Sequence, residues 1–220
     1  MGKLIVIEGT DGSGKSTQFR LLSQRLEQEG VEFKHIVFPR YDQDSSALIR
    51  MYLGGEFGSS PTDVNAYAAS TFYAVDRFAS FRKDWQEFYE NGGIIIADRY
   101  VTSNLVHQAG KISDAAEKER YIQWLSDLEY NIFGLPKPDR VIFLDMPPAY
   151  SLKLRQQRNE LKQGLTADIH EADQTYLQNA YENALGIAKH QKWHTISCVA
   201  DDNIRTIEDI HAEILRTIHE

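Results

Sequence analysis

The fold of this chain is decided by the stretch Gly9-Thr10-Asp11-Gly12-Ser13-Gly14-Lys15-Ser16-Thr17. It follows the apolar run Leu4–Ile7 and leads into a segment, Phe19–Leu26, with apolar residues at helical spacing. The stretch matches the phosphate-binding pattern G-x-x-x-x-G-K-[ST], in the strand-then-helix context that this pattern requires. We therefore predict a loop whose backbone N–H groups bind phosphate oxygens at the N-terminus of a helix.

Two side chains of the loop extend this prediction to a metal-bound nucleoside triphosphate. Lys15 can bridge the β- and γ-phosphates, and the hydroxyl of Ser16 can ligate Mg²⁺. The alternative is an ordinary glycine-rich turn with a surface lysine. The strand, the spacing, the lysine and the hydroxyl all agree with the motif, which favours nucleotide binding.

Composition bounds the remaining possibilities. A length of 220 residues suits one domain, residues 1–220. The net charge of −8 argues against nucleic acid as a partner. The single cysteine, Cys198, excludes an internal disulfide, and its apolar neighbours indicate a buried thiol. No signal peptide or run of about 18 apolar residues is present, so we expect a cytoplasmic protein without a membrane partner.

Short apolar, β-branched runs alternate with longer helical patterns, which predicts βαβ units and a parallel sheet covered by helices on both faces. The expected strands are Leu4–Ile7, His35–Phe38, Ile94–Ala97, Val141–Leu144 and His194–Val199. The expected helices are Lys15–Gln28, Ser45–Leu53, Val64–Asn91, a stretch after Asp98, Asp114–Tyr130, Pro148–Lys162, Glu171–Lys189 and Ile204–Thr217. Ligands of such sheets bind at the carboxyl ends of the strands.

Two arginines follow expected strands and so belong to this edge. Arg40 lies in Phe38-Pro39-Arg40-Tyr41, and Arg99 lies in Asp98-Arg99-Tyr100. The planar guanidinium suits bidentate phosphate recognition, so the pair could hold a second phosphate group opposite the triphosphate. For Arg40 a plain surface position is an equal alternative. For Arg99 it is weaker, because charge at the end of a buried strand is costly unless paired or used.

Two further segments carry candidate residues. The expected long helix contains Thr71–Phe78, with Asp76 and Arg77 among aromatic residues that are by themselves typical of a core. A polar helix with Arg155 and Arg158 runs into a glycine-containing loop, so this region is either a solvated surface or a closing lid.

In order and spacing, these motifs together resemble those of the thymidylate kinase family of P-loop nucleoside monophosphate kinases. The resemblance runs nearly end to end and is carried by Glu8–Thr17, Phe38-Pro39, the aromatic stretch ending at Arg77, Asp98-Arg99-Tyr100 with Ser103 and Gln108, Leu135–Asp139, and a lid-like region around 155–171. It implies a P-loop NTPase fold, a three-layer α/β/α sandwich with a five-stranded parallel sheet. It also implies ATP- and Mg²⁺-dependent phosphorylation of dTMP to dTDP, usually by a homodimer.

The resemblance also implies roles for individual residues. ATP would be bound by the loop and an adenine contact, namely Gly9, Thr10, Asp11, Gly12, Ser13, Gly14, Lys15, Ser16, Thr17 and Arg155. dTMP would be bound by Asp11 near the 3′-hydroxyl, Phe72 or Tyr73 on the thymine ring, Arg77 and Gln108 on its polar edge, Ser103 beside them, and Arg99 with Arg40 at the phosphate. Mg²⁺ would be held by Ser16 and organised by Asp98. The catalytic residues would be Lys15, Asp98, Arg99 and Arg158.

The chain departs from the family pattern in three places. Some members carry an arginine where this chain has Gly12, so a cation at the γ-phosphate must come from the lid. The lid run Asp168-Ile169-His170-Glu171 lacks the arginine of other members, which leaves Arg158 and, less securely, Lys162 or Arg155. Arg40 stands one residue earlier than the family's arginine, so its contact with the acceptor phosphate is an open question.

Two other functions remain as alternatives. The first is a kinase for another nucleoside monophosphate or for a deoxynucleoside, although deoxynucleoside kinases tend to show Glu-Arg-Ser where this chain has Asp98-Arg99-Tyr100. The second is a nucleotide-binding switch without turnover. Pro136 stands where a guanine-recognition motif needs asparagine, and an arginine is present on the acceptor side, so both observations count against the switch.

Overall fold

The computed structural model describes residues 1–161 and 174–219. Its main sheet has five parallel strands in the order β2-β3-β1-β4-β5. The strands are β1 (Lys3–Glu8), β2 (Phe33–Val37), β3 (Ile94–Asp98), β4 (Arg140–Asp145) and β5 (His194–Ser197). The predicted α/β class with a five-stranded parallel sheet is confirmed, and β1 lies at its centre.

The two faces of the sheet can be read from the alternation along β1. Leu4 and Val6 pack into one apolar cluster, whereas Ile5 and Ile7 pack into another on the opposite face. All four side chains are buried. A strand that is apolar at every position is typical of a parallel sheet covered on both sides.

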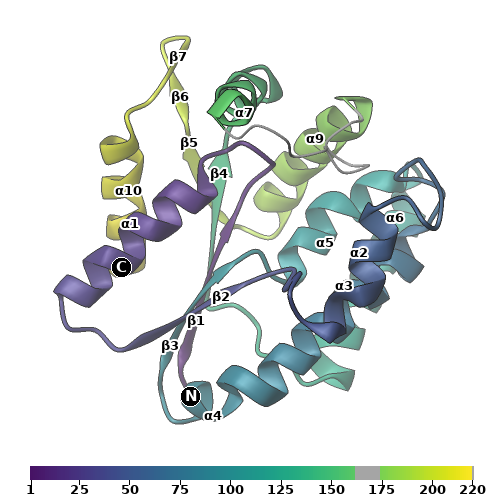
Figure 1. The fold of residues 1–220 in the computed structure, drawn as a ribbon, viewed down its shortest axis with the longest axis horizontal. Helices are drawn as coiled ribbons and strands as arrows, with labels where there is room; N and C mark the ends of the chain where they lie inside the picture. The colour runs from purple at the N-terminus through teal and green to yellow at the C-terminus, as the bar shows by residue number, and fades with distance from the viewer. Residues whose placement is uncertain (162–173, 220) are drawn as a thin grey trace.

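Helices form the outer layers on both sides of the sheet (Figure 1). The helices on the Ile5 face are α1 (Lys15–Gln28) and α10 (Ile207–His219). The helices on the Leu4 face are α3 (Ala66–Ser80), α5 (Val101–His107), α6 (Ala115–Ser126) and α9 (Gln174–His190). The other helices are α2 (Ala47–Leu53), α4 (Gln86–Glu90) and α7 (Pro148–Leu161). Among the described helices, none combines the length and the apolar character needed to cross a bilayer.

The helix expected over Val64–Asn91 is interrupted. Asn65 caps it by accepting a hydrogen bond from the Ala68 N–H at 2.9 Å, so α3 begins at Ala66, two residues later than expected. A π-helical turn over Phe81–Trp85 then separates α3 from α4. The turn places two bulky aromatic rings in the core, which periodicity alone does not reveal.

The expected strand over His194–Val199 is also too long. β5 ends at Ser197, and Val199 pairs instead with Ile204 in a short antiparallel hairpin of β6 (Val199–Ala200) and β7 (Asn203–Ile204). The last helix therefore begins at Ile207 rather than at Ile204.

A buried ion pair joins the helices on the Leu4 face. Arg77 of α3 and Glu129, in the turn that follows α6, are both almost completely buried. The Arg77 Nε donates to Glu129 Oε2 at 2.6 Å, and its Nη2 donates to Oε1. The Arg77 Nη1 also donates to the Tyr100 carbonyl oxygen at 3.3 Å, so one guanidinium connects α3, α6 and the segment after β3. Two charges in this interior are tolerated because the pairing is bidentate.

We expect Glu129→Gln to lower the free energy of unfolding by about 3–5 kcal/mol, because it leaves the Arg77 charge buried without a counter-charge. Urea unfolding followed by circular dichroism measures the change. The control is Glu29→Gln, which removes the exposed pair with Arg25 and should cost less than about 1 kcal/mol. Equal effects of the two substitutions would show that the buried pair does not stabilise the fold.

Candidate active site

A cavity of about 580 Å³ opens at the carboxyl edge of the sheet. Its walls come from the loop after β1, the ends of β2 and β3, and the helices α3 and α5. The predicted site residues that line it are Asp11, Gly12, Ser13, Gly14, Lys15, Ser16, Thr17, Tyr73, Arg77, Asp98, Arg99, Ser103 and Gln108. The cavity therefore gathers residues that are far apart in sequence.

The loop between β1 and α1 forms one wall of the cavity. Gly12 and Gly14 have φ values of 83° and 89°, a left-handed conformation that favours glycine. Gly14 stands directly before α1, so the free N–H groups of the first helical turn lie at the cavity. Thr10 is buried behind this wall. The geometry is that of an anion-binding loop.

Lys15 is held at the cavity by the loop itself. Its Nζ donates to the carbonyl oxygens of Gly9, at 2.6 Å, and Thr10, at 3.0 Å. Burial, together with the positive charge of Arg99, lowers the pKa of Lys15 to about 8. A phosphate group placed beside Lys15 would favour the charged form and raise this pKa again.

Arg99 forms the wall next to the loop and is paired with it. Its guanidinium makes an ion pair with Asp11, and its Nη1 lies 3.0 Å from Nε2 of His107 on α5. Its backbone has a φ of 65°, which is uncommon for a residue with a side chain. Burial opposes the charge, but the carboxylates of Asp11, Glu8 and Asp98 raise the pKa of Arg99, so it stays cationic.

Glu8 supports the wall formed by Arg99 through hydrogen bonds. It was not among the site residues predicted from the sequence. Its buried Oε1 accepts hydrogen bonds from the Thr102 and Ser103 hydroxyls, both at 2.6 Å, and from the Tyr100 N–H at 3.3 Å. Ser103 was predicted to lie beside the substrate base. In the structure its hydroxyl donates a hydrogen bond to Glu8. The sequence feature that could have identified Glu8 is its position as an acidic residue at the end of a buried strand, directly before the loop.

α3 contributes the wall predicted to face the base. Tyr73 and Arg77 are four residues apart, so they share one side of the helix, and both line the cavity. Phe72 lies outside the lining and packs against Tyr52 and Phe57, with ring centroids 6.3 and 5.9 Å apart. Of the two aromatic candidates, the structure brings Tyr73 to the cavity.

His107 and Asn104 on α5, together with Tyr41 after β2, also line the cavity and were missed in the sequence. The Tyr176 ring of α9 stacks on the His107 ring with centroids 6.3 Å apart. The side of α5 that faces the cavity is set by the packing of the helix, and no local sequence motif marks that side.

Several buried oxygens at this site have no hydrogen-bond partner within the part of the chain that the structure describes. They are Glu8 Oε2, Thr10 Oγ1, Ser13 Oγ, Asp98 Oδ1 and Gln108 Oε1. Buried polar atoms are nearly always satisfied in native proteins. Their concentration here is consistent with a site that is completed by polar ligands, and an unpartnered carboxylate oxygen on Asp98 fits a role in holding hydrated Mg²⁺.

The remaining predicted residues are not placed at the cavity. Arg40 lies outside its lining. Arg155 and Arg158 belong to α7, and the structure does not describe their side chains, although Leu154 beside them lines the cavity. Lys162 and the lid run that ends at Glu171 lie outside the described residues.

A sequence model of the family described as thymidylate kinase matches residues 7–214. The chain belongs to the thymidylate kinase family. The thymidylate kinase of Plasmodium falciparum is 30% identical, over 99% of this chain and 90% of its own length. A probable thymidylate kinase of Thermococcus gammatolerans is 31% identical, over 100% and 97%. The solved thymidylate kinase of Candida albicans superimposes with a TM-score of 0.72 at 25% identity, covering 99% of this chain and 91% of that one.

Membership confirms the predicted family, fold and reaction. The enzyme is a nucleotide kinase that phosphorylates dTMP to dTDP, and its family uses ATP as the phosphoryl donor. The deoxynucleoside kinase and the non-catalytic switch are thereby set aside.

We expect nucleotide binding to take up a proton, increasingly so as the pH rises through about 8, because triphosphate raises the lowered pKa of Lys15. Calorimetric titration with a non-hydrolysable ATP analogue, in buffers of different ionisation enthalpy, measures the uptake. The control is Lys15→Arg, whose side chain stays protonated. Uptake of the same size in that variant would assign the proton to another group.

Proposed function

We propose that this thymidylate kinase binds the ATP phosphates at the Gly9–Thr17 loop and dTMP between Arg99 and α3. The observation that carries the proposal is the Arg99–Asp11 ion pair, which joins the arginine after β3 to the Gly9–Thr17 loop at one cavity. A single cavity that binds both phosphorylated substrates would bring the donor and acceptor phosphates together.

On the donor side, the loop N–H groups and Lys15 would hold the β- and γ-phosphates. Two carbonyl oxygens of the loop hold the Lys15 Nζ, which reduces the side-chain entropy lost on binding. Arg155 on α7 would pack against the adenine, close to the point where Leu154 reaches the cavity.

On the acceptor side, Arg99 would bind the dTMP phosphate, and Tyr73 would stack on the thymine. Gln108, whose buried Oε1 lacks a partner among the described residues, and Arg77 would hydrogen-bond the polar edge of the base. Three N–H groups of Arg77 are engaged by Glu129 and Tyr100, while Nη1 and Nη2 each carry a second hydrogen. Asp11 would lie near the 3′-hydroxyl, with Ser103 beside the base.

The chemistry asks for alignment and neutralisation of charge rather than a strong base, because the dTMP phosphate is already ionised at neutral pH. Ser16 and, through water, Asp98 would hold Mg²⁺, which would supply positive charge to neutralise the phosphates. Lys15 and Arg99 would stabilise the negative charge on either side of the transferred group.

One cation of the transition state would come from outside the loop, because Gly12 offers no charge. We place it in the lid of a single domain spanning residues 1–220, in the segment around 155–171. Arg158 is the first candidate, and Lys162 or Arg155 are alternatives. The backbone of α7 brings this segment's start to the cavity edge at Leu154.

We further propose that the enzyme is a homodimer. Exposed apolar side chains gather on neighbouring elements: Val75 and Phe78 on α3, Leu48 on α2, and Ile132 beside the Phe133 ring that contacts Phe78. Apolar surface grouped in this way is typical of a protein interface.

The test of the proposed site is a turnover assay with ATP, Mg²⁺ and a panel of dTMP, dUMP, dGMP and thymidine, following ADP release. We expect the highest kcat/KM with dTMP, and a fall of about a hundred-fold or more in Arg99→Ala, because a buried charge contact with the phosphate is lost. An unchanged dTMP affinity in Arg99→Ala would refute Arg99 as the phosphate ligand, and equal turnover of all four acceptors would refute the base contacts.

A further inference from the structure

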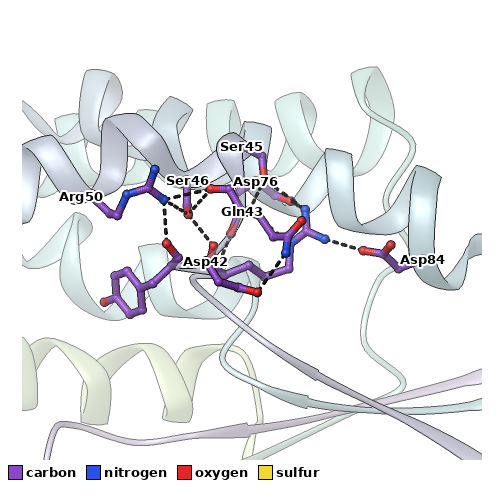
Figure 2. Close-up of polar contacts among 9 residues, drawn as sticks. Asp42, Gln43, Ser45, Ser46, Arg50, Asp76 and Asp84 are labelled. Atoms are coloured by element: carbon purple, nitrogen blue, oxygen red, sulfur yellow. Dashed lines mark hydrogen bonds and ion pairs between the residues drawn. The ribbon is translucent and has the colours of Figure 1, made fainter.

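Arg40 is held away from the cavity by a network of polar contacts. Its Nε donates to Asp76 Oδ1 at 3.2 Å, and its Nη2 donates to the Ser45 hydroxyl at 3.1 Å and to the Asp76 carbonyl oxygen at 3.4 Å. Its Nη1 is paired with Asp84. Figure 2 shows Asp76, Ser45 and Asp84 grouped around this guanidinium. All three of its nitrogens therefore have protein partners.

Asp76 is the buried centre of the network. It is 0% exposed, and its carboxylate accepts from the Arg40 backbone N–H at 2.9 Å, from the Arg40 Nε and from the Ser45 hydroxyl at 2.6 Å. Moving Arg40 toward a substrate phosphate would leave this carboxylate buried without its counter-charge, which is strongly unfavourable. Arg40 is therefore poorly suited to be a phosphate ligand.

The chain that follows Arg40 is also held by hydrogen bonds. The Arg50 Nη1 donates to the Tyr41 carbonyl oxygen at 2.7 Å and to the Gln43 carbonyl oxygen at 2.9 Å (Figure 2). The Ser46 hydroxyl donates to the Arg40 carbonyl oxygen. These contacts hold the backbone from Arg40 to Gln43, and the Phe38 N–H donates to the Asp98 carbonyl oxygen at 3.1 Å. Phe38, Pro39 and Tyr41 of this segment line the cavity.

The other end of the network lies on the helix that faces the base. Asp76 is adjacent to Arg77 and one turn from Tyr73 on α3, and both neighbours line the cavity. The Arg40–Asp76 pair thus joins two walls of the cavity directly, the wall formed by Phe38–Tyr41 and the wall formed by α3.

We propose that the Arg40–Asp76 pair is a positioning device that sets the spacing between these two walls, so that Arg40 supports dTMP binding without touching the phosphate. This inference rests on the proposed placement of dTMP between the walls. It assigns to Arg40 a role different from the phosphate contact that the family resemblance suggested.

The test compares dTMP with thymidine, which lacks the phosphate, in calorimetric binding measurements on the full chain. For Arg40→Ala we expect both dissociation constants to rise by a similar factor of about ten, because the wall moves for both ligands. Arg99→Ala should weaken dTMP far more than thymidine, and Arg25→Ala, which removes an exposed arginine paired with Glu29, should change neither. A loss of dTMP affinity at least about ten times larger than the loss of thymidine affinity in Arg40→Ala would overturn the inference.

The direction in which a second substitution changes the affinity for dTMP distinguishes the two possible roles of Arg40. Asp76→Asn should weaken both ligands, because the pair that holds the wall is broken. If Arg40 were a phosphate ligand restrained by Asp76, the same substitution would release it and tighten dTMP binding, which would contradict the proposal.

Two controls keep these results interpretable. Near-ultraviolet circular dichroism reports whether each variant folds. Where Arg40→Ala does not fold, Ser45→Ala removes two hydrogen bonds of the same network and should weaken both ligands by about two- to three-fold. A loss confined to dTMP in Ser45→Ala overturns the inference. If Arg99→Ala leaves the dTMP-to-thymidine ratio unchanged, the proposed phosphate site fails, and the Arg40 comparison is still decided by its own ratio.

Discussion

The ion pair between Arg99 and Asp11 is the contact on which the organisation of this active site depends. Asp11 belongs to the loop that follows β1, and Arg99 follows β3. β1 and β3 are neighbours in the sheet, with Ile7 opposite Asp98, so the two segments leave the sheet side by side. Each wall then affects the other electrostatically: after burial, the charge of Arg99 is the largest influence that lowers the pKa of Lys15. The cavity contains cations that bound phosphates would stabilise.

The surrounding structure keeps these cations in place. Glu8, at the end of the central strand, accepts three hydrogen bonds from the segment after Arg99 and so supports its left-handed backbone. On the opposite side, α3 is anchored by two ion pairs from consecutive residues, Asp76 with the partly buried Arg40 and Arg77 with the buried Glu129. One pair faces the wall after β2 and the other faces α6. The chain as a whole carries a net charge of −8, so the positive character of the cavity is local.

The sequence predicted those features that depend on short stretches of chain. The loop, the central strand and Arg99 could be recognised because spacing within about ten residues determines their geometry. The role of Arg40 could not be recognised, since it depends on Asp76, which lies 36 residues away and reaches Arg40 only when α3 packs beside the loop. Glu8 and His107 were missed for the same reason. The π-helical turn after α3 could not be predicted either, because its apolar pattern is compatible with an uninterrupted helix.

A crystal structure of the full chain with dTMP and a non-hydrolysable ATP analogue tests the arrangement of the two substrates most directly. We expect the guanidinium of Arg99 within hydrogen-bond distance of the dTMP phosphate, the Lys15 Nζ at the β- and γ-phosphates of the analogue, and Arg40 still bonded to Asp76. A dTMP phosphate bound by Arg40, with Arg99 contacting only Asp11 and His107, would contradict the division of roles between the two arginines.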